Sequence, residues 1–246
     1  MVPTPVTTAV ILAAGMGTRL SGITGGHIPK GLLPVGGRTL VERSLDKLER
    51  HGIRRTVIVT GHLGGFYDEL ASRRPGVETI RNQEYADTGS MFSLAVAAPL
   101  IDGPFLLLES DLIYEERALQ LLQESPLDDA VLISGFTRSE DEVFIEVEGA
   151  RISKMSKKRE ELGTILGELS GLNKISLPLL SRMVKLCRAN PLRQYHYEYA
   201  ITDASAIEPV GYVFCHDLVW AEIDDAQHLE RVERVLIPRL QKLGEE

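Results

Sequence analysis

The chain has 246 residues, of which 43% are hydrophobic and 25% charged; 27 Lys and Arg stand against 35 Asp and Glu, a formal net charge of −8. This composition is that of a globular protein with a sizeable core, and the acidic balance argues against a general nucleic-acid-binding surface. It does not exclude a small phosphorylated ligand, which needs only a few positive groups in one place.

Nothing in the sequence indicates a membrane or secreted protein. Apolar runs fall short of the roughly 20 residues that span a bilayer, and the N-terminal stretch lacks the basic segment of a signal peptide. The two cysteines, Cys187 and Cys215, stand far apart with no metal-binding spacing. We therefore expect a cytoplasmic protein with reduced thiols.

Short apolar runs alternate with amphipathic segments through the first part of the chain. The predicted strands are 6–13, 55–60, 78–81, 105–108 and 130–134, and the predicted helices are 41–52, 66–73, 90–98 and 115–123. This alternation is typical of parallel βαβ units. It predicts an α/β fold with an open, mostly parallel sheet and helices on both faces.

The pattern changes after about residue 135. Residues 142–147 and 151–155 alternate apolar and polar positions around Glu148-Gly149, which predicts a β-hairpin. The remaining predictions are helices at 177–189, 192–204 and 225–242 and strands at 207–213 and 220–223. Since no linker or repeat interrupts the chain, we expect one domain over residues 1–246 with an elaborated second half.

A glycine-rich loop follows the first predicted strand. A dinucleotide-binding fingerprint needs a third glycine where Leu20 stands, and no Gly-Lys-Ser/Thr of a Walker loop occurs. What remains is a loop with Arg19 near its start and Lys30 near its end. Glycines let backbone N–H groups approach phosphates closely, and the two cations add charge. The pattern favours a triphosphate-binding loop; a solvated loop with two surface cations is the alternative.

Residues 12–19, LAAGMGTR, and 29–33, PKGLL, together resemble the signature of the nucleotidyltransferase (nucleoside-diphosphate-sugar pyrophosphorylase) superfamily. The resemblance covers nearly the whole chain. It implies a nucleotide-binding half over about residues 1–135, and an acceptor-binding half of hairpin and helices over about 136–246. It also implies catalytic roles for Arg19 and Lys30. The implied phosphate-loop residues are Leu12, Ala13, Ala14, Gly15, Met16, Gly17 and Thr18.

Two acidic segments are candidates for a metal site. Strand 105–108 delivers Glu109-Ser110-Asp111 to a strand end, and a second group arrives with WAEIDD at 220–225. Hard cations such as Mg²⁺ are usually held by one or two carboxylates and substrate phosphates. The resemblance implies that Asp111 and Asp224 are the metal ligands, and we expect Asp225 to cap the following helix. Without the resemblance, each aspartate would be interpreted as a cap or turn residue.

The segment 82–94, NQEYADTGSMFSL, suits a loop entering a helix. In the superfamily this loop contacts base and ribose, which implies nucleotide-binding roles for Asn82, Tyr85, Thr88, Gly89 and Ser90. Its form, together with LLESDLIYE and WAEIDDAQHLERV, resembles cytidylyltransferases that act on choline phosphate and, more closely, on 2-aminoethylphosphonate. Helix capping by Thr88 or Ser90 is the alternative interpretation.

A small zwitterionic acceptor needs a cation for its phosphonate and carboxylates or aromatic faces for its ammonium group. Lys157 falls where related enzymes place an acceptor-phosphate lysine, although a solvated Lys-Lys pair is an alternative. The candidates for the ammonium end are Tyr114, Asp141, Glu168, Tyr197 and Glu198, each of which a structural role would also explain. Acids outnumber rings in this set, which weakly favours a primary amine.

The sequence-based hypothesis is a Mg²⁺-dependent cytidylyltransferase that joins CMP from CTP to 2-aminoethylphosphonate and releases pyrophosphate. The alternatives are a CTP:phosphocholine cytidylyltransferase, a sugar-1-phosphate nucleotidyltransferase and an inactive nucleotide-binding regulatory protein. The expected partners are CTP and a small zwitterionic phosphonate or phosphate, without nucleic acid or membrane; a homodimer is left open. We expect His27, His51, His62 and His228 to be structural or solvated.

Overall fold

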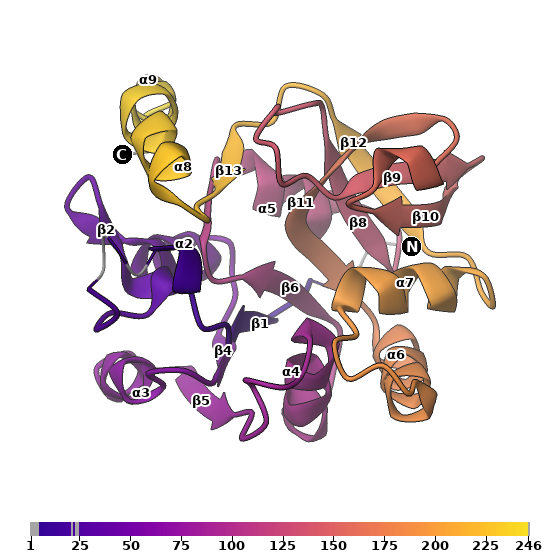
Figure 1. Ribbon diagram of the computed structural model, residues 1–246, viewed down its shortest axis with the longest axis horizontal. Helices are drawn as coiled ribbons and strands as arrows, with labels where there is room; N and C mark the ends of the chain where they lie inside the picture. Colours follow the sequence, from indigo (N-terminus) through magenta and orange to yellow (C-terminus); the bar gives the residue numbers. More distant parts are fainter. Residues whose placement is uncertain (1–4, 21, 23–24, 246) are drawn as a thin grey trace.

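The computed structural model describes residues 5–20, 22 and 25–245. The first half of the chain forms a parallel sheet (Figure 1). β1 (Thr8–Ala13) lies between β4 (Arg55–Thr60) and β6 (Phe105–Glu109), and β5 (Val77–Arg81) pairs with β4. Because these strands run in one direction, their carboxyl ends share one edge of the sheet, where ligands of open α/β sheets bind.

A long antiparallel strand joins this sheet to the second half of the chain. β11 (Ile165–Ile175) pairs along its second part with β6, and β8 (Ala130–Ser134) pairs along its other side. β12 (Gly211–Cys215) lies parallel to β8. The hairpin of β9 (Phe144–Glu148) and β10 (Arg151–Ser156) pairs with the first part of β11. Among the described residues these nine strands form one mixed sheet.

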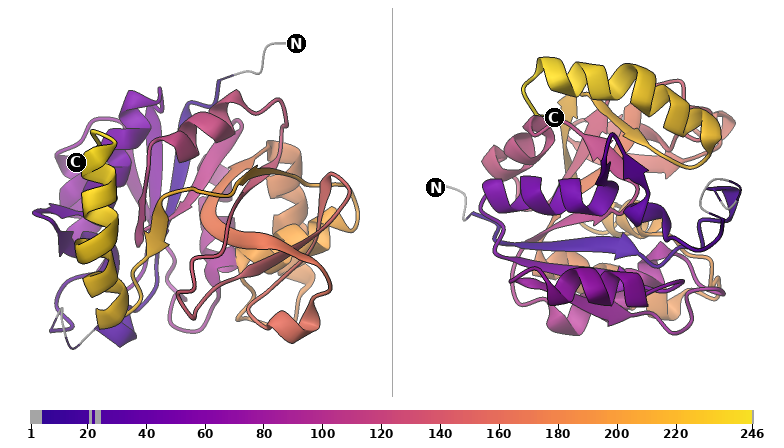
Figure 2. Two further views of the ribbon diagram at one scale, coloured as in Figure 1. Left: turned by 90° about the horizontal axis from the view of Figure 1, so that it is seen from above. Right: turned by 90° about the vertical axis from the view of Figure 1, so that its left-hand side faces the viewer.

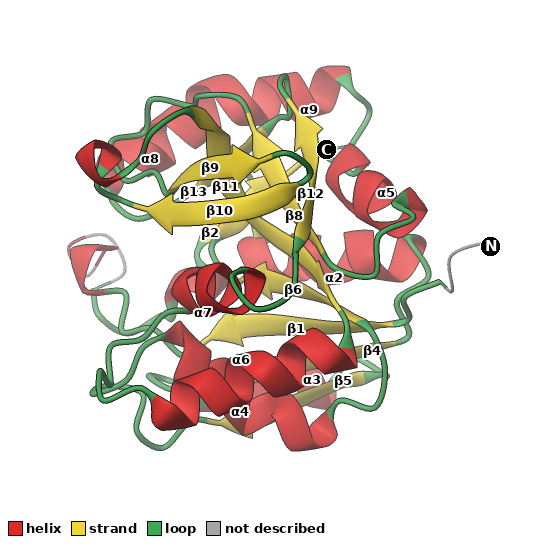
Figure 3. Cartoon of the chain, turned by 90° about the vertical axis from the view of Figure 1, so that its right-hand side faces the viewer, coloured by secondary structure: helices red, strands yellow, loops and turns green. Residues whose placement is uncertain are grey.

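Helices cover both faces of the sheet (Figures 2 and 3). One face packs against α2 (Leu40–Arg50), α3 (Gly65–Ser72) and α5 (Arg117–Glu124), and the other against α4 (Ser90–Ala97), α6 (Leu177–Ala189) and α7 (Tyr197–Ser205). β1 shows why its sequence is apolar throughout. Ile11 packs on the face covered by α2, α3 and α5, and Val10 packs on the opposite face. Successive side chains of β1 therefore enter two different cores.

A third, smaller core lies beside the main sheet, under the C-terminal helices at the upper left of Figure 1. It contains two short ladders, β2 (Pro34–Val35) with β3 (Arg38–Thr39), and β7 (Leu112–Tyr114) with β13 (Trp220–Glu222). The helices that cover it are α8 (Ala226–Arg231), a π-helical segment (Val232–Leu236) and α9 (Ile237–Lys242). No helix in the described part of the chain has the length and apolar character to cross a bilayer.

The predicted fold class is confirmed, and several elements agree residue for residue, among them β4, β8 and α6. The main difference is β11, which the sequence analysis did not predict. Two other predictions were displaced: α7 begins at Tyr197 and not at residue 192, and β12 covers 211–215 and not 207–213. Residues 21, 23 and 24 of the glycine-rich loop lie outside the described residues.

Candidate active site

A cleft of about 750 Å³ lies at the carboxyl end of the parallel strands. Most of the residues predicted for the site line it together. They are Leu12, Ala13, Ala14, Gly15, Met16, Gly17, Thr18, Arg19, Lys30, Tyr85, Thr88, Gly89, Ser90, Asp111, Lys157, Glu198 and Asp224. Segments more than 200 residues apart in sequence therefore meet around one space, as the salt bridge of Arg19 with Asp224 illustrates.

Glycine at two positions, one in the loop after β1 and one beside it, allows this loop to line the cleft. Gly17 has a φ of +59°, a left-handed conformation that side-chain-bearing residues rarely adopt. At Gly61, just after β4, a Cβ atom would lie 2.5 Å from the backbone oxygen of Ala14 and 2.6 Å from Cβ of Tyr85. The absence of a side chain at Gly61 thus lets the loop that carries Tyr85 lie directly beside the loop after β1.

Lys30 lies at the centre of the charged groups in the cleft. Its Nζ contacts the carboxylate of Asp111 and lies 2.6 Å from Oδ1 of Asp224 and 3.6 Å from Oε1 of Glu222. Burial by itself lowers the pKa of Lys30, but Asp111, Glu222 and Asp224 outweigh it and raise the pKa above its ordinary value. Lys30 is therefore a permanent cation held in a fixed position.

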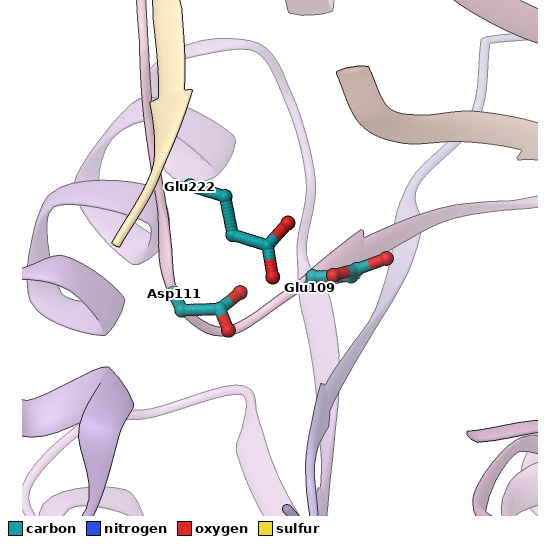
Figure 4. A group of neighbouring side chains, drawn as sticks. All are labelled: Glu109, Asp111 and Glu222. Atoms are coloured by element: carbon teal, nitrogen blue, oxygen red, sulfur yellow. The ribbon is translucent and has the colours of Figure 1, made fainter. Parts of the chain in front are cut away.

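Figure 4 shows three neighbouring carboxylates, those of Glu109, Asp111 and Glu222. Glu109, Asp111 and Glu222 each offer an oxygen within 4.8 Å of the others. Burial and the negative charge of Asp111 raise the pKa of Glu109 to about 8, and the same two causes raise the pKa of Glu222 well above its ordinary value. Such crowded acids repel one another, so the cluster favours a bound cation.

The aspartates predicted as metal ligands fit that role. Oδ1 of Asp111 and Oδ2 of Asp224 are buried, and within the described ranges neither has a hydrogen-bond partner. Buried polar oxygens are normally satisfied, and an oxygen without a partner is available to a hard cation. With Glu109 and Glu222 beside them, the donor set is the oxygen-only kind that Mg²⁺ prefers.

Arg19 and Lys157 are joined through one carboxylate. Oδ2 of Asp141 lies 2.8 Å from Nη1 of Arg19, and its Oδ1 lies 2.7 Å from Nζ of Lys157. Burial would raise the pKa of Asp141, but the hydrogen bonds from Lys157 and Arg19 lower it to about 2. Nη2 of Arg19 also lies 3.0 Å from Oδ1 of Asp224. Asp141 thus connects the glycine-rich loop with the hairpin of the second half.

The loop between β5 and α4 is held by its own side chains and by the segment before α7. The amide of Asn82, which is buried beneath the cleft, donates to Oγ1 of Thr88 at 3.0 Å and to Oγ of Ser93 at 3.1 Å. The N–H of Gly89 donates to the carbonyl of Arg193 at 2.8 Å. A Cβ atom at Gly89 would lie 2.3 Å from the carbonyl oxygen of Tyr195, so glycine permits this contact.

Four predicted acceptor residues are not among the residues that line the cleft. One is Asp141, whose carboxylate is bonded to Arg19 and Lys157. The other three are Tyr114, Glu168 and Tyr197. Tyr114 is buried in the core beneath α2, and Glu168 accepts hydrogen bonds from the backbone N–H and the hydroxyl of Thr137. Tyr197 is buried and donates its hydroxyl proton to Oε1 of Glu109 at 2.5 Å. We therefore do not assign these three residues to direct contact with an acceptor.

The sequence analysis missed ten residues of the lining, and five of these are considered in turn: Glu109, Gln194, His196, Tyr199 and Glu222. For two of them a signal was present. Glu109 and Glu222 are the last residues of β6 and β13, two positions before Asp111 and Asp224, so each acid could have been proposed from its neighbour in sequence. Nothing in the pattern identified the other three, because the position of the segment at 194–199 depends on its contact with Gly89.

A family model described as a MobA-like NTP transferase domain matches residues 9–242, and the chain therefore belongs to this nucleotidyltransferase family. A bifunctional IPC transferase and DIPP synthase from Thermococcus kodakarensis is 25% identical over 93% of this chain and 50% of its own length. A CMP-5'-(3-aminopropyl)phosphonate synthase from Streptomyces rubellomurinus is 28% identical over 88% of this chain and 37% of its own length.

A 2-aminoethylphosphonate cytidylyltransferase from Lancefieldella rimae is 31% identical over 45% of this chain and 45% of its own length. The chain thus spans half or less of the length of these curated relatives. Cytidylyltransferases are among its homologues, but the matches leave the acceptor open.

Solved structures share the fold. The inositol-1-phosphate CTP transferase from T. maritima superposes with a TM-score of 0.78 at 17% identity, covering 95% of this chain and 98% of the other. For the CTP:phosphocholine cytidylyltransferase from Streptococcus pneumoniae the TM-score is 0.76 at 21% identity, with coverage of 95% and 100%. At these identities the likeness supports the fold and not the substrate.

Proposed function

We propose that this protein is a CTP-dependent cytidylyltransferase that transfers CMP to 2-aminoethylphosphonate and releases pyrophosphate. The observation that carries the proposal is the single cleft in which the glycine-rich loop, the buried Lys30 and a group of carboxylates meet Lys157 and Glu198. This arrangement offers cations for phosphates, acids for a metal and for an amine, and a loop that lies close enough to contact a base.

The reaction needs positioning and charge stabilisation rather than proton transfer. A phosphonate oxygen of the acceptor attacks the α-phosphorus of CTP, the bond from that phosphorus to the bridging oxygen breaks, and pyrophosphate leaves with the electron pair. A general base is unnecessary, because the attacking phosphonate is already ionised at neutral pH. Catalysis then depends on holding the reactants in line and on opposing the negative charge that develops.

Each half of the chain supplies groups for this reaction. We assign Lys30 to the charge on the transferring phosphoryl group, Arg19 to the leaving pyrophosphate, and the backbone N–H groups of residues 14–17 to the phosphates of CTP. Asp111 and Asp224, with Glu109 and Glu222 beside them, would hold Mg²⁺. When bound, the ion supplies additional positive charge to the substrate phosphates.

The acceptor assignment depends on what surrounds Lys157. Lys157 is the candidate for the phosphonate, and the buried Glu198, which also lines the cleft, is the candidate for the ammonium group. Of the three tyrosines at 195–199, Tyr195 and Tyr197 are buried with their hydroxyls bonded to Asp203 and Glu109, and Tyr199 is the one that lines the cleft. An acid, Glu198, with one tyrosine ring from this segment suits a primary amine better than a trimethylammonium group, which favours several rings around it.

The test is pyrophosphate release from CTP in the presence of Mg²⁺, measured with 2-aminoethylphosphonate, 3-aminopropylphosphonate, phosphocholine, inositol 1-phosphate and glucose 1-phosphate. We expect the highest kcat/KM with 2-aminoethylphosphonate, and CTP to be preferred over UTP and dTTP. Equal or higher turnover of phosphocholine would favour the alternative function, that of a CTP:phosphocholine cytidylyltransferase. A solved enzyme of that activity shares the fold. Preference for a sugar phosphate, or no turnover of any acceptor, would overturn the proposal.

A further inference from the structure

His228 lies behind the cleft, in the first turn of α8. Its side chain is buried, with 9% of the residue exposed, and it is not among the residues that line the cleft. The helix cap fixes its backbone: the carboxylate of Asp225 accepts from the N–H groups of Gln227 and His228, both at 2.9 Å. This confirms the predicted cap and orients the imidazole toward the chain segments next to Asp224.

Two hydrogen bonds define the state of this imidazole. The backbone N–H of Asp224 lies 3.2 Å from Nδ1, and the carbonyl oxygen of Ser139 lies 2.9 Å from Nε2. A backbone N–H can only donate and a carbonyl can only accept. The pair of partners therefore assigns the tautomer with a lone pair on Nδ1 and the proton on Nε2, because it alone satisfies both.

The segment bound at Nε2 needs such support. Arg138 and Glu140, on either side of Ser139, have φ values of 59° and 72°, in the left-handed region that residues with side chains disfavour. The next residue, Asp141, bridges Arg19 and Lys157. Arg231 ties the start of the same loop to α8, donating from Nη2 to the carbonyl oxygen of Thr137 at 2.7 Å.

The two bonds of His228 therefore act on the two carboxylates that hold Arg19. One bond fixes Asp224, whose Oδ1 lies 3.0 Å from Nη2 of Arg19. The other fixes the loop of Asp141, whose Oδ2 lies 2.8 Å from Nη1. We infer that His228 is a positioning residue that aligns Asp224 for metal binding and, with the loop of Asp141, aims the Arg19 guanidinium at the substrate phosphates. This inference rests on the proposed function.

The variants are chosen to test the hydrogen bonds at Nδ1 and Nε2 of His228. His228→Leu removes both bonds, whereas His228→Asn keeps an acceptor oxygen close to the position of Nδ1. Arg231→Leu is the matched control, because it cuts the other tie between α8 and the loop but does not touch Asp224. Asp224→Asn sets the scale for direct loss of a metal ligand. Circular dichroism and thermal unfolding check that each variant folds.

The first measurement is Mn²⁺ binding to the protein without acceptor, followed by electron paramagnetic resonance of free Mn²⁺. Partners that orient metal ligands change metal affinity by roughly 10- to 100-fold, so we expect binding to weaken about 10-fold in His228→Leu. We expect His228→Asn and Arg231→Leu to stay within about twofold of the wild type, since both keep a hydrogen-bond acceptor for the N–H of Asp224. Unchanged binding in His228→Leu, or equal losses in His228→Asn and His228→Leu, would overturn the inference.

The second measurement is the ¹⁵N spectrum of the His228 ring in the wild-type protein. A proton on Nε2 and a lone pair on Nδ1 support the inference, and a proton on Nδ1 contradicts it, whether or not any variant folds. Neither measurement requires turnover. If the acceptor panel fails while Mn²⁺ binding and the tautomer agree with expectation, the fault lies with the proposed reaction and not with His228.

Discussion

The two halves of the molecule present polar groups to the cleft in different ways. In the first half, the loop after β1 follows directly from a buried strand and offers backbone N–H groups, with glycines where the backbone must turn or approach closely. In the second half, side chains hold charged groups both within that half, as Asp141 holds Lys157, and in the first half, as Tyr197 holds Glu109. The first arrangement is local in sequence, and the second depends on contacts between distant segments.

The largest effect is expected from removing Lys30, the cation that contacts carboxylates from both halves of the chain. Lys30→Met should lower kcat and kcat/KM together by about 100- to 1000-fold, because the proposed role of Lys30 is to oppose charge that develops in the transition state. Steady-state pyrophosphate release measures both constants. A loss confined to the KM for CTP would show that Lys30 only binds substrate.

The contact between the loop joining β5 to α4 and the second half can be disturbed by one methyl group. Gly89→Ala places a Cβ atom 2.3 Å from the carbonyl oxygen of Tyr195, so one of the two segments must move. Overpacking of this kind costs about 1–3 kcal/mol of unfolding free energy. We also expect the KM values for both substrates to rise, measured by urea unfolding and steady-state kinetics.

Gly103→Ala is the control for this change, since a Cβ atom there meets nothing within 4 Å. It should leave stability and both KM values close to those of the wild type. If Gly89→Ala raised the KM for CTP alone, the loop that carries Gly89 and the segment that carries Tyr195 would act independently, and their close contact would have no functional meaning.

Glu198→Gln tests the second half by itself. Burial raises the pKa of Glu198, so its charge is sensitive to its surroundings, and an approaching ammonium group would stabilise the ionised form. We expect the KM for 2-aminoethylphosphonate to rise about 10-fold, in line with the loss of a charge-assisted hydrogen bond, while the KM for CTP stays the same. An equal rise for an acceptor without an amine would contradict this role.

The smallest effect is expected in the first half, outside the cleft. Thr39 and Glu42 form a capping box at the start of α2, and Thr39→Ala should cost about 1 kcal/mol of unfolding free energy without changing kcat. If both halves form one domain, thermal unfolding should remain a single transition at a lower temperature. Two separate transitions would refute the predicted single domain.

The same variant has a pH dependence with a defined sign. Hydrogen bonds from Thr39 lower the pKa of Glu42, so their contribution is present above the unfolded-state pKa and is lost as the pH falls through the lower folded value. The stability difference between wild type and Thr39→Ala should therefore be larger at about pH 7 than at about pH 3. A difference that grew on acidification would contradict the capping box.

Sequence patterns predicted the parts of the fold whose periodicity is local. β4, β8 and α6 were correct because each is a short apolar run or an amphipathic repeat. β11 was missed because its buried positions include Glu168, Ser170 and Asn173, polar residues that are more typical of a loop. Their burial follows from strands on both sides, which a single segment does not reveal.

The candidate site also contains residues that a local motif could predict and residues that depend on contacts between distant segments. The glycine-rich loop with Arg19 and Lys30, and the aspartates at two strand ends, could be proposed from motif and resemblance, and these residues do meet in the cleft. Tyr114 was misplaced because its side chain points from β7 into a core. The part played by His228 was not predictable, since the partners that define its tautomer, Asp224 and Ser139, come from segments 85 residues apart.

β11 has a mechanical consequence. Its hydrogen bonds run to β9 and β8 along its first part and to β6 and β8 along its second, so the two halves of the molecule share one strand. A bending motion between the halves would have to break that ladder. The shared strand therefore opposes closure of the molecule as two hinged lobes.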